Sequence, residues 1–234
     1  MERWAGKIAV VTGASAGIGE AIAKALVRYG MVVVGLARRV DRVQEIAKQL
    51  TKEKGKMYAL KADVSNEGEI KAAFKWVREN LKTIHVLVNN AGILIDQYVS
   101  EPIDAKALRK LYDVNVIGLS ICTSEALQLM RDTGVDDGHI IHINSSKHAV
   151  TVLTEGLRRE LVSKNSKIRV SSVSPGLVKT DIFEAAHDGR ASTVFQENPY
   201  LNQEDIADAV IYVLGAPPHV QVHEITIKPV GEKM

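Results

Sequence analysis

Short apolar runs alternate with longer amphipathic runs along almost the whole chain. The β-branched run KIAVVT at residues 7–12 is followed by GIGEAIAKALVRYG at 17–30, in which apolar residues recur at helical spacing. This pattern predicts strands at residues 7–12, 31–37, 56–62, 85–90, 138–144, 167–174 and 224–229. It predicts helices at residues 17–30, 40–50, 67–80, 105–130, 148–161 and 205–216. Apolar strands that alternate with helices need right-handed crossovers, which give a parallel sheet with both faces covered.

We therefore expect an α/β fold of the doubly wound Rossmann type, a three-layer sandwich around a seven-stranded parallel sheet. The chain of 234 residues suits one hydrophobic core, and no repeat or linker divides it. Residues 1–234 are thus expected to form a single domain. Residues 92–102 and 176–201 lack regular patterning, and each region follows a strand. Both should lie over the carboxyl edge of the sheet, where ligands bind in open parallel sheets.

The composition excludes several kinds of partner. The chain has 30 Lys and Arg against 28 Asp and Glu, and a net charge of +2 gives no reason to expect nucleic acid or an anionic membrane. The single cysteine, Cys122, excludes an internal disulfide and an all-cysteine metal cluster, and no metal is expected. No signal peptide or membrane-spanning run is recognisable, so the expected location is the cytoplasm.

The segment TGASAGIG at residues 12–19 joins the first predicted strand to the first predicted helix. Glycines let the backbone turn sharply and approach a pyrophosphate, while the N–H groups of the helix start face the phosphates. A glycine-rich loop alone is a weak signal, but its place in the first strand–helix unit favours a dinucleotide site. The candidate cofactor-binding residues of this loop are Gly13, Ser15, Gly17, Ile18 and Gly19.

The residues after the second predicted strand indicate which nicotinamide cofactor is used. An acidic side chain there binds the ribose 2′-hydroxyl of NAD, whereas an arginine suits the 2′-phosphate of NADP. The chain reads Leu36-Ala37-Arg38-Arg39, with no acid. Two guanidinium groups favour NADP(H), with Arg38 the first candidate and Arg39 the second. The alternative is that both are solvated charges, which is disfavoured because cations at a helix start oppose the helix dipole.

Several motifs follow one another in the order TGASAGIG, NNAG, DVNVIG, an IN-serine, SKHAV and SPGLVKT. Together they resemble the short-chain dehydrogenase/reductase family over essentially the whole chain. The resemblance implies hydride transfer between a carbinol carbon and the nicotinamide ring. It implies that Asp63 and Val64 contact the adenine and that Asn115 holds a proton-relay water by kinking its helix. Further cofactor-binding residues implied by it are Asn90, Ala91, Gly92, Lys147, Pro175, Gly176, Val178 and Thr180.

The runs MERW, VVGLARR and APPHVQVHEITIKP resemble an insect farnesol-dehydrogenase-like group within that family. This group is similar to vertebrate members that act on ketosteroids, which implies a small apolar alcohol or carbonyl substrate. The resemblance also implies a homodimer or homotetramer formed through the helices starting near Ala105 and Ser146. Apolar residues at 93–99 and around Phe183 and Phe195 agree with a lipophilic substrate. The alternative, that they only pack the loops, stays open.

One element of the implied chemistry is missing. The resemblance implies a tyrosine that passes the proton, and a lysine one helical turn later that lowers the phenol pKa. It also implies a serine that hydrogen-bonds the substrate oxygen, so Asn115, Ser145 and Lys147 are the candidate catalytic residues. The position four residues before Lys147 is Ile143, inside a predicted strand. Tyr98, His142 and His148 lack the one-turn spacing to Lys147 and are poor replacements.

Three interpretations follow from the missing tyrosine. In the first, which we favour, the sequence lacks a loop that the active reductase carries, because the match on both sides of the cut is good. In the second, the deletion is genuine, and the chain binds NADP(H) as a scaffold or sensor without an acid/base. In the third, the deletion leaves a poorly folded chain.

Overall fold

The computed structural model describes residues 1–95, 102–143, 147–186 and 191–232. Seven strands form one sheet of order β3-β2-β1-β4-β5-β6-β7, in which every pairing is parallel. The strand order changes direction between β1 and β4, as it does in doubly wound sheets. The predicted fold class is confirmed. The strands are β1 Ile8–Thr12, β2 Val32–Ala37, β3 Lys56–Lys61, β4 Val86–Asn89, β5 His139–Ile143, β6 Arg169–Pro175 and β7 Glu224–Ile227.

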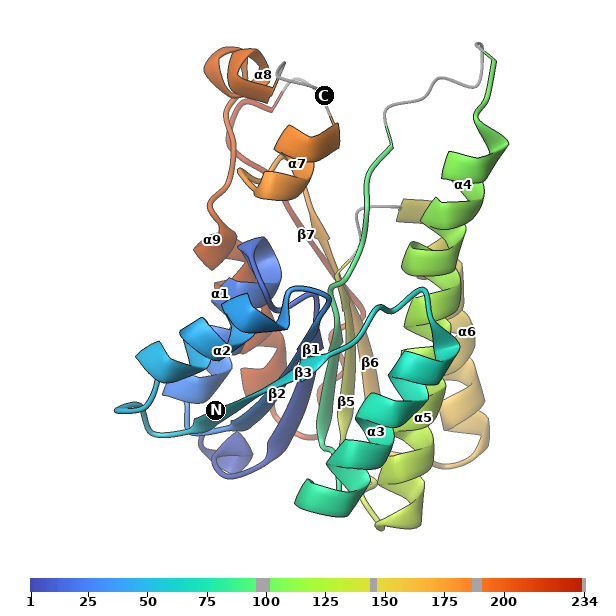
Figure 1. The fold of residues 1–234 in the computed structure, drawn as a ribbon. Helices are drawn as coiled ribbons and strands as arrows, with labels where there is room; N and C mark the ends of the chain where they lie inside the picture. The colour runs from blue at the N-terminus through green and yellow to red at the C-terminus, as the bar shows by residue number, and fades with distance from the viewer. Residues whose placement is uncertain (96–101, 144–146, 187–190, 233–234) are drawn as a thin grey trace.

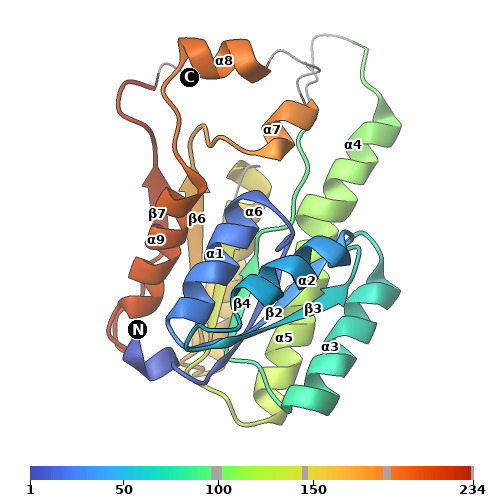
Figure 2. The same ribbon diagram turned by 60° about the vertical axis from the view of Figure 1, so that its left-hand side comes forward.

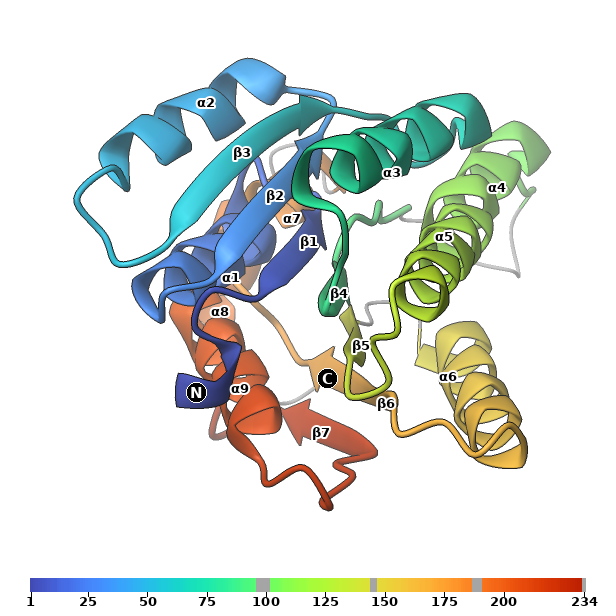
Figure 3. The same cartoon turned by 90° about the horizontal axis from the view of Figure 1, so that it is seen from below.

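Helices cover both faces of the sheet (Figures 1 and 3). One face carries α1 (Gly17–Arg28), α2 (Val40–Gln49) and α9 (Gln203–Gly215). The other carries α3 (Glu67–Leu81), α4 (Ala105–Tyr112), α5 (Leu119–Asp132) and α6 (Lys147–Ser163). Two short helices, α7 (Asp181–Ala186) and α8 (Ala191–Glu197), lie beyond the carboxyl ends of the strands, at the top of Figure 2. In the described ranges, no helix is long and apolar enough to cross a membrane.

Two hydrophobic clusters fill the space between the sheet and its two helical layers. Neighbouring residues of β1 point to opposite faces, so Val10 belongs to one cluster and Val11 to the other. Trp4, in the short turn η1 (Glu2–Trp4), is buried in the cluster beneath α1 and α9, and its indole N–H donates to the Leu214 carbonyl oxygen at 2.8 Å. Trp76 of α3 packs at the opposite cluster, with its ring 5.4 Å from that of Tyr58.

Two local expectations were wrong. Residues 176–201 are not irregular, because they contain α7 and α8. The α8 sequence ASTVFQE has too few apolar residues to show a helical period. The predicted helix at 105–130 is not regular throughout, because the segment η2 (Asp113–Gly118) between α4 and α5 has π-helical hydrogen bonding. Helix α6 begins at Lys147, three residues after the fifth predicted strand ends.

Candidate active site

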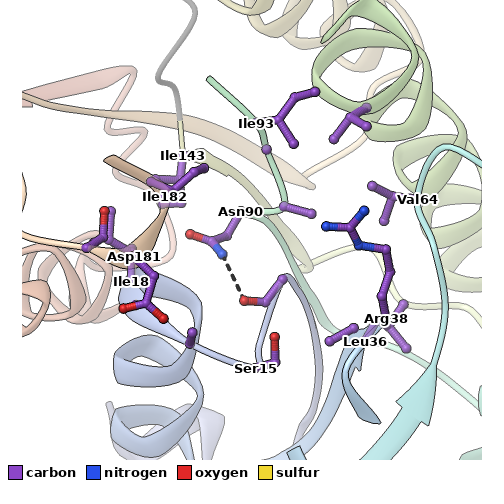
Figure 4. A pocket seen from close by; sticks show the side chains of 18 of the residues that line it. Ser15, Ile18, Leu36, Arg38, Val64, Asn90, Ile93, Ile143, Asp181 and Ile182 are labelled. Atoms are coloured by element: carbon purple, nitrogen blue, oxygen red, sulfur yellow. Dashed lines mark hydrogen bonds between the residues drawn. The ribbon is translucent and has the colours of Figure 1, made fainter. Parts of the chain in front are cut away.

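A cavity of about 660 Å³ lies at the carboxyl ends of β1, β2 and β4, where the strand order changes direction (Figure 4). Arg38 and Val64 lie at one end of it, Ile143 and Ile182 lie at the other, and Asn90 lies between them. Ligands of doubly wound sheets bind at this place. The lining residues are Gly13, Ser15, Ala16, Gly17, Ile18, Leu36, Ala37, Arg38, Arg39, Ala62, Asp63, Val64, Asn90, Ala91, Gly92, Ile93, Leu94, Lys110, Val114, Ile143, Pro175, Thr180, Asp181 and Ile182.

The glycine-rich loop is locked to the turn after β4. Gly13 has a φ of +71°, and a Cβ there would lie 2.9 Å from Cα of Ala91 and from Nδ2 of Asn90. The Asn90 amide donates to the Thr12 carbonyl oxygen at 3.0 Å, and the Thr12 hydroxyl accepts from the N–H of Ala91 at 2.9 Å. The loop thus presents bare backbone and the first turn of α1 to the cavity, an arrangement that fits a pyrophosphate.

Gly19→Ala is expected to lower the free energy of unfolding by about 1 to 3 kcal/mol and to weaken NADPH binding, because a Cβ there would overlap the Gly13 carbonyl oxygen. Urea unfolding and a fluorescence titration with NADPH measure the two effects. Gly156→Ala in α6 is the matched control, because a Cβ there would meet no described atom within 4 Å outside its own helix. It should raise the free energy of unfolding by about 0.5 to 1 kcal/mol. Equal effects at the two positions would contradict the crowding at Gly19.

The end of the cavity beside β2 carries several charges. Nη1 of Arg38 lies 4.0 Å from Oδ2 of Asp63, and Nη2 of Arg39 donates to Oγ of Ser15 at 3.5 Å. Partial burial raises the pKa of Asp63, but hydrogen bonds from the following turn and the charges of Arg38 and Lys110 hold this pKa below its ordinary value. Among the described lining residues, this end has three cations and one carboxylate, an excess of positive charge that suits a phosphate.

Most of the residues predicted to bind the cofactor line the cavity. Gly19 lies behind the loop, and Val178 forms a backbone bridge to Leu201. Gly176 contacts the C-terminal tail, since a Cβ there would lie 2.8 Å from Oε1 of Glu232. The remaining exception is Lys147, the first residue of α6, whose side chain lies outside the described part of the chain.

The predicted catalytic residues differ in how far the structure describes them. Asn115 is buried in η2, where its amide accepts from the Ile93 N–H and donates to the Ile93 carbonyl oxygen, both at 2.9 Å. Those bonds fix the strand-to-loop segment after β4, which lines the cavity. Ser145, like Tyr98, lies outside the described residues.

At the other end of the cavity lie the apolar side chains of Ile143 and Ile182 (Figure 4), and Ile93 and Leu94 also line the cavity. Phe183 and Phe195, expected near the substrate, are not among the lining residues. Their rings lie 5.1 Å apart, and Phe195 lies 5.3 Å from the ring of Tyr200, so these aromatic residues pack α7 and α8 against each other.

Comparisons with known proteins decide the family. A family model described as short chain dehydrogenase matches residues 7–191. The chain belongs to the short-chain dehydrogenase/reductase family. It is therefore an oxidoreductase by family. The farnesol dehydrogenase of Aedes aegypti is 48% identical over 251 aligned residues, which cover 100% of both chains. Dehydrogenase/reductase SDR family member 11 of Gallus gallus is 43% identical and covers 98% of both.

Solved structures of other short-chain dehydrogenase/reductases superpose closely on this one. A serine dehydrogenase in complex with NADP+ has a TM-score of 0.87 at 28% identity, covering 97% of this chain and 96% of that one. An alcohol dehydrogenase from Thermococcus sibiricus, in complex with 5-hydroxy-NADP, has a TM-score of 0.84 at 28% identity and covers 97% and 98%.

The alignment with the mosquito enzyme has more positions than this chain has residues. It has 251 positions and the chain has 234 residues, so about 17 positions hold a residue of the mosquito protein alone. The connection between β5 and α6 is short, with three residues between Ile143 and Lys147.

His142 of β5 is buried beside this connection but does not line the cavity. Its Nδ1 lies 2.9 Å from Oγ1 of Thr154 in α6, and its Nε2 lies 3.5 Å from Oγ1 of Thr123 in α5. Burial lowers the pKa of His142 to about 4. His142 therefore joins β5 to two helices of this dehydrogenase/reductase as a neutral side chain, which does not suit it to replace the tyrosine.

Acidification is expected to destabilise the protein through His142. The imidazole has a pKa of about 4 in the folded protein and near 6.5 when unfolded, so the unfolded chain takes up the proton first. The contribution of the neutral imidazole to the free energy of unfolding is complete above pH about 6.5 and is lost as the pH falls toward 4. Urea unfolding across this range measures how steeply the free energy of unfolding changes with pH. His142→Asn should reduce that slope by up to about 1.4 kcal/mol per pH unit. Equal slopes would contradict a neutral buried imidazole.

Proposed function

We propose that this protein uses NADP(H) to interconvert an apolar alcohol and its carbonyl, provided that a tyrosine-bearing segment precedes Lys147. The observation that carries the cofactor choice is the pair Arg38 and Arg39, which line the cavity at the end of β2, where no acid stands. The NADP complexes of two similar structures support this choice.

The described residues suit each part of the cofactor. The glycine loop and the first turn of α1 would hold the pyrophosphate, and Arg38 and Arg39 would hold the 2′-phosphate. Asp63 and Val64 would contact the adenine, while Pro175 and Thr180 would hold the nicotinamide. When bound, the nicotinamide ring supplies or accepts the hydride.

The substrate end of the cavity favours an uncharged molecule. Ile143 and Ile182 at that end, together with Ile93 and Leu94, present hydrocarbon to the cavity, and burial of apolar surface drives binding of a lipophilic alcohol or carbonyl. Because a similar protein is a farnesol dehydrogenase, an isoprenoid is the first substrate class to test, followed by retinoids and steroids.

The proton step needs the missing segment. We place the unmatched stretch of about 17 residues between Ile143 and Lys147, where the connection is short and the tyrosine is expected. In the longer form, the tyrosine would pass the proton, Lys147 would lower the phenol pKa, and Ser145 would hydrogen-bond the substrate oxygen. Asn115 would hold a relay water.

A second candidate function follows from the sequence as it stands. With Ile143 at the tyrosine position, the chain would bind NADP(H) without its acid/base and would act as a scaffold or sensor. The assembly proposed for either function is a homodimer or homotetramer through α4, α5 and α6. Apolar side chains are exposed on α6, where Val152 is 72% exposed, and on η2 between α4 and α5, where Ile117 is 50% exposed.

Three measurements on the purified protein test these functions in turn. Intact mass decides whether the protein has only the 25.6 kDa of this sequence or a further segment. Fluorescence titrations with NADPH and NADH test the cofactor, and tighter NADH binding would overturn the NADP proposal. NADPH turnover on isoprenoid, retinoid and steroid carbonyls tests the reaction. Bound cofactor without turnover of any substrate favours the scaffold.

A further inference from the structure

An acidic side chain lies where a pyrophosphate is expected. Asp181, the first residue of α7, lines the cavity and lies on the same side of it as Ile18 of α1 (Figure 4). It directly follows Thr180, whose Cγ2 would lie 3.4 Å from a Cβ on Gly17. The start of α7 therefore rests on the phosphate loop itself.

A free carboxylate at this place opposes cofactor binding. Like charges repel, and the pyrophosphate group is negatively charged in every nicotinamide dinucleotide. Among the described residues, Arg38 pairs with Asp63 and Arg39 is hydrogen-bonded to Ser15, and neither forms an ion pair with Asp181. The charge of Asp181 is therefore balanced from outside the cavity.

Arg42 of α2 provides that balance. Its Nη1 lies 3.7 Å from Oδ2 of Asp181, and Arg42 is not among the residues that line the cavity. The two side chains are 54% and 65% exposed, so water and salt weaken their attraction without removing it. The ion pair therefore offsets the charge of the Asp181 carboxylate beside the loop.

We propose that Arg42 is a positioning residue for the cofactor: by pairing with Asp181, it neutralises a carboxylate that otherwise repels the pyrophosphate. The inference rests on the proposed dinucleotide site and deepens it. It predicts opposite signs for the two partners, because removing Arg42 exposes the carboxylate, whereas removing the carboxylate leaves a cation beside the phosphates. If the ion pair served only to hold α2 and α7 together, removing either partner would weaken cofactor binding.

The experiment is a fluorescence titration with NADPH and with NADH of the unaltered chain, Arg42→Gln, Asp181→Asn and the double variant. Arg42→Gln should weaken binding roughly three- to tenfold, and Asp181→Asn should tighten it by up to about threefold. The double variant should bind like the unaltered chain. The fold-changes in affinity should be equal for NADPH and NADH, because both contain the pyrophosphate. They should shrink in 1 M salt, where the Debye length is about 3 Å.

Arg28 and Glu53 form the matched control, an ion pair of 3.5 Å with 61% and 37% exposed side chains, away from the cavity. Arg28→Gln and Glu53→Gln should leave both affinities unchanged; a loss equal to that of Arg42→Gln would overturn the inference. Weaker binding by Asp181→Asn, or an effect of Arg42→Gln on NADPH alone, would also overturn it. If the protein prefers NADH but the two substitutions still change affinity in opposite directions, only the proposed choice of NADP(H) is wrong. If the protein binds neither cofactor, both the proposed cofactor site and the role of Arg42 are wrong.

Discussion

Turnover with NADPH should rise by roughly 10²- to 10⁴-fold when the stretch of about 17 residues that the mosquito relative carries is inserted before Lys147. The register of the insertion must place a tyrosine four residues upstream of that lysine. The expected gain is that of a general acid/base whose phenol pKa is lowered by a neighbouring ammonium group. Steady-state kinetics on an isoprenoid aldehyde measure it.

The matched control is the same insertion with phenylalanine at the tyrosine position. It should bind NADPH as tightly as the tyrosine form and show no gain in turnover, because only the hydroxyl is missing. If the 234-residue chain reduces the substrate as fast as the tyrosine form, another group passes the proton and the proposed role of the segment is wrong.

Arg38→Asp should weaken NADPH binding by about 100-fold and leave NADH binding equal or tighter. The substitution removes a guanidinium that would bind the 2′-phosphate and adds a carboxylate, which repels the phosphate but accepts hydrogen bonds from a ribose hydroxyl. The substitution also removes the contact between Arg38 and Asp63, at 4.0 Å. This loss is the same whether NADPH or NADH binds, so it does not change the ratio of the two affinities. Fluorescence titrations with the two cofactors measure the ratio.

Arg28→Asp makes the same change of charge at the far end of α1 and controls for the net charge of the protein. It should not alter the ratio of the two affinities. Equal weakening of NADPH and NADH by Arg38→Asp would mean that Arg38 does not read the 2′-phosphate, and Arg39 would become the first candidate.

The sequence predicted the sheet and most of the cavity because both depend on local pattern. A strand such as IAVVT is apolar on both faces, and glycines at 13 and 17 are required by the turn that joins it to α1. Lys110 and Asp181 were missed as lining residues, because each is one charge among others on a helix. Only the crossing of α4 and α7 over the strand ends brings them to the cavity.

Other features depend on contacts that no local pattern shows. The π-helical turn around Asn115 coincides with the pairing of its amide to Ile93, a residue of a distant loop. Phe183 and Phe195 are 12 positions apart and looked like substrate contacts, yet they pack on each other because α7 and α8 meet. Hydrophobic periodicity describes one element at a time and does not encode such pairings.

Each of the two helical layers contains one tryptophan, whose fluorescence reports on that layer alone. Trp4 is buried among α1 and α9, and Trp76 lies against Tyr58 on the opposite face, while the sequence contains no third indole. Trp76→Phe therefore leaves an emission spectrum that follows the first layer, and Trp4→Phe leaves one that follows the second. Coincident denaturation curves from the two variants would mean that the sheet and both layers melt as one cooperative unit. Separated curves would show which layer opens first.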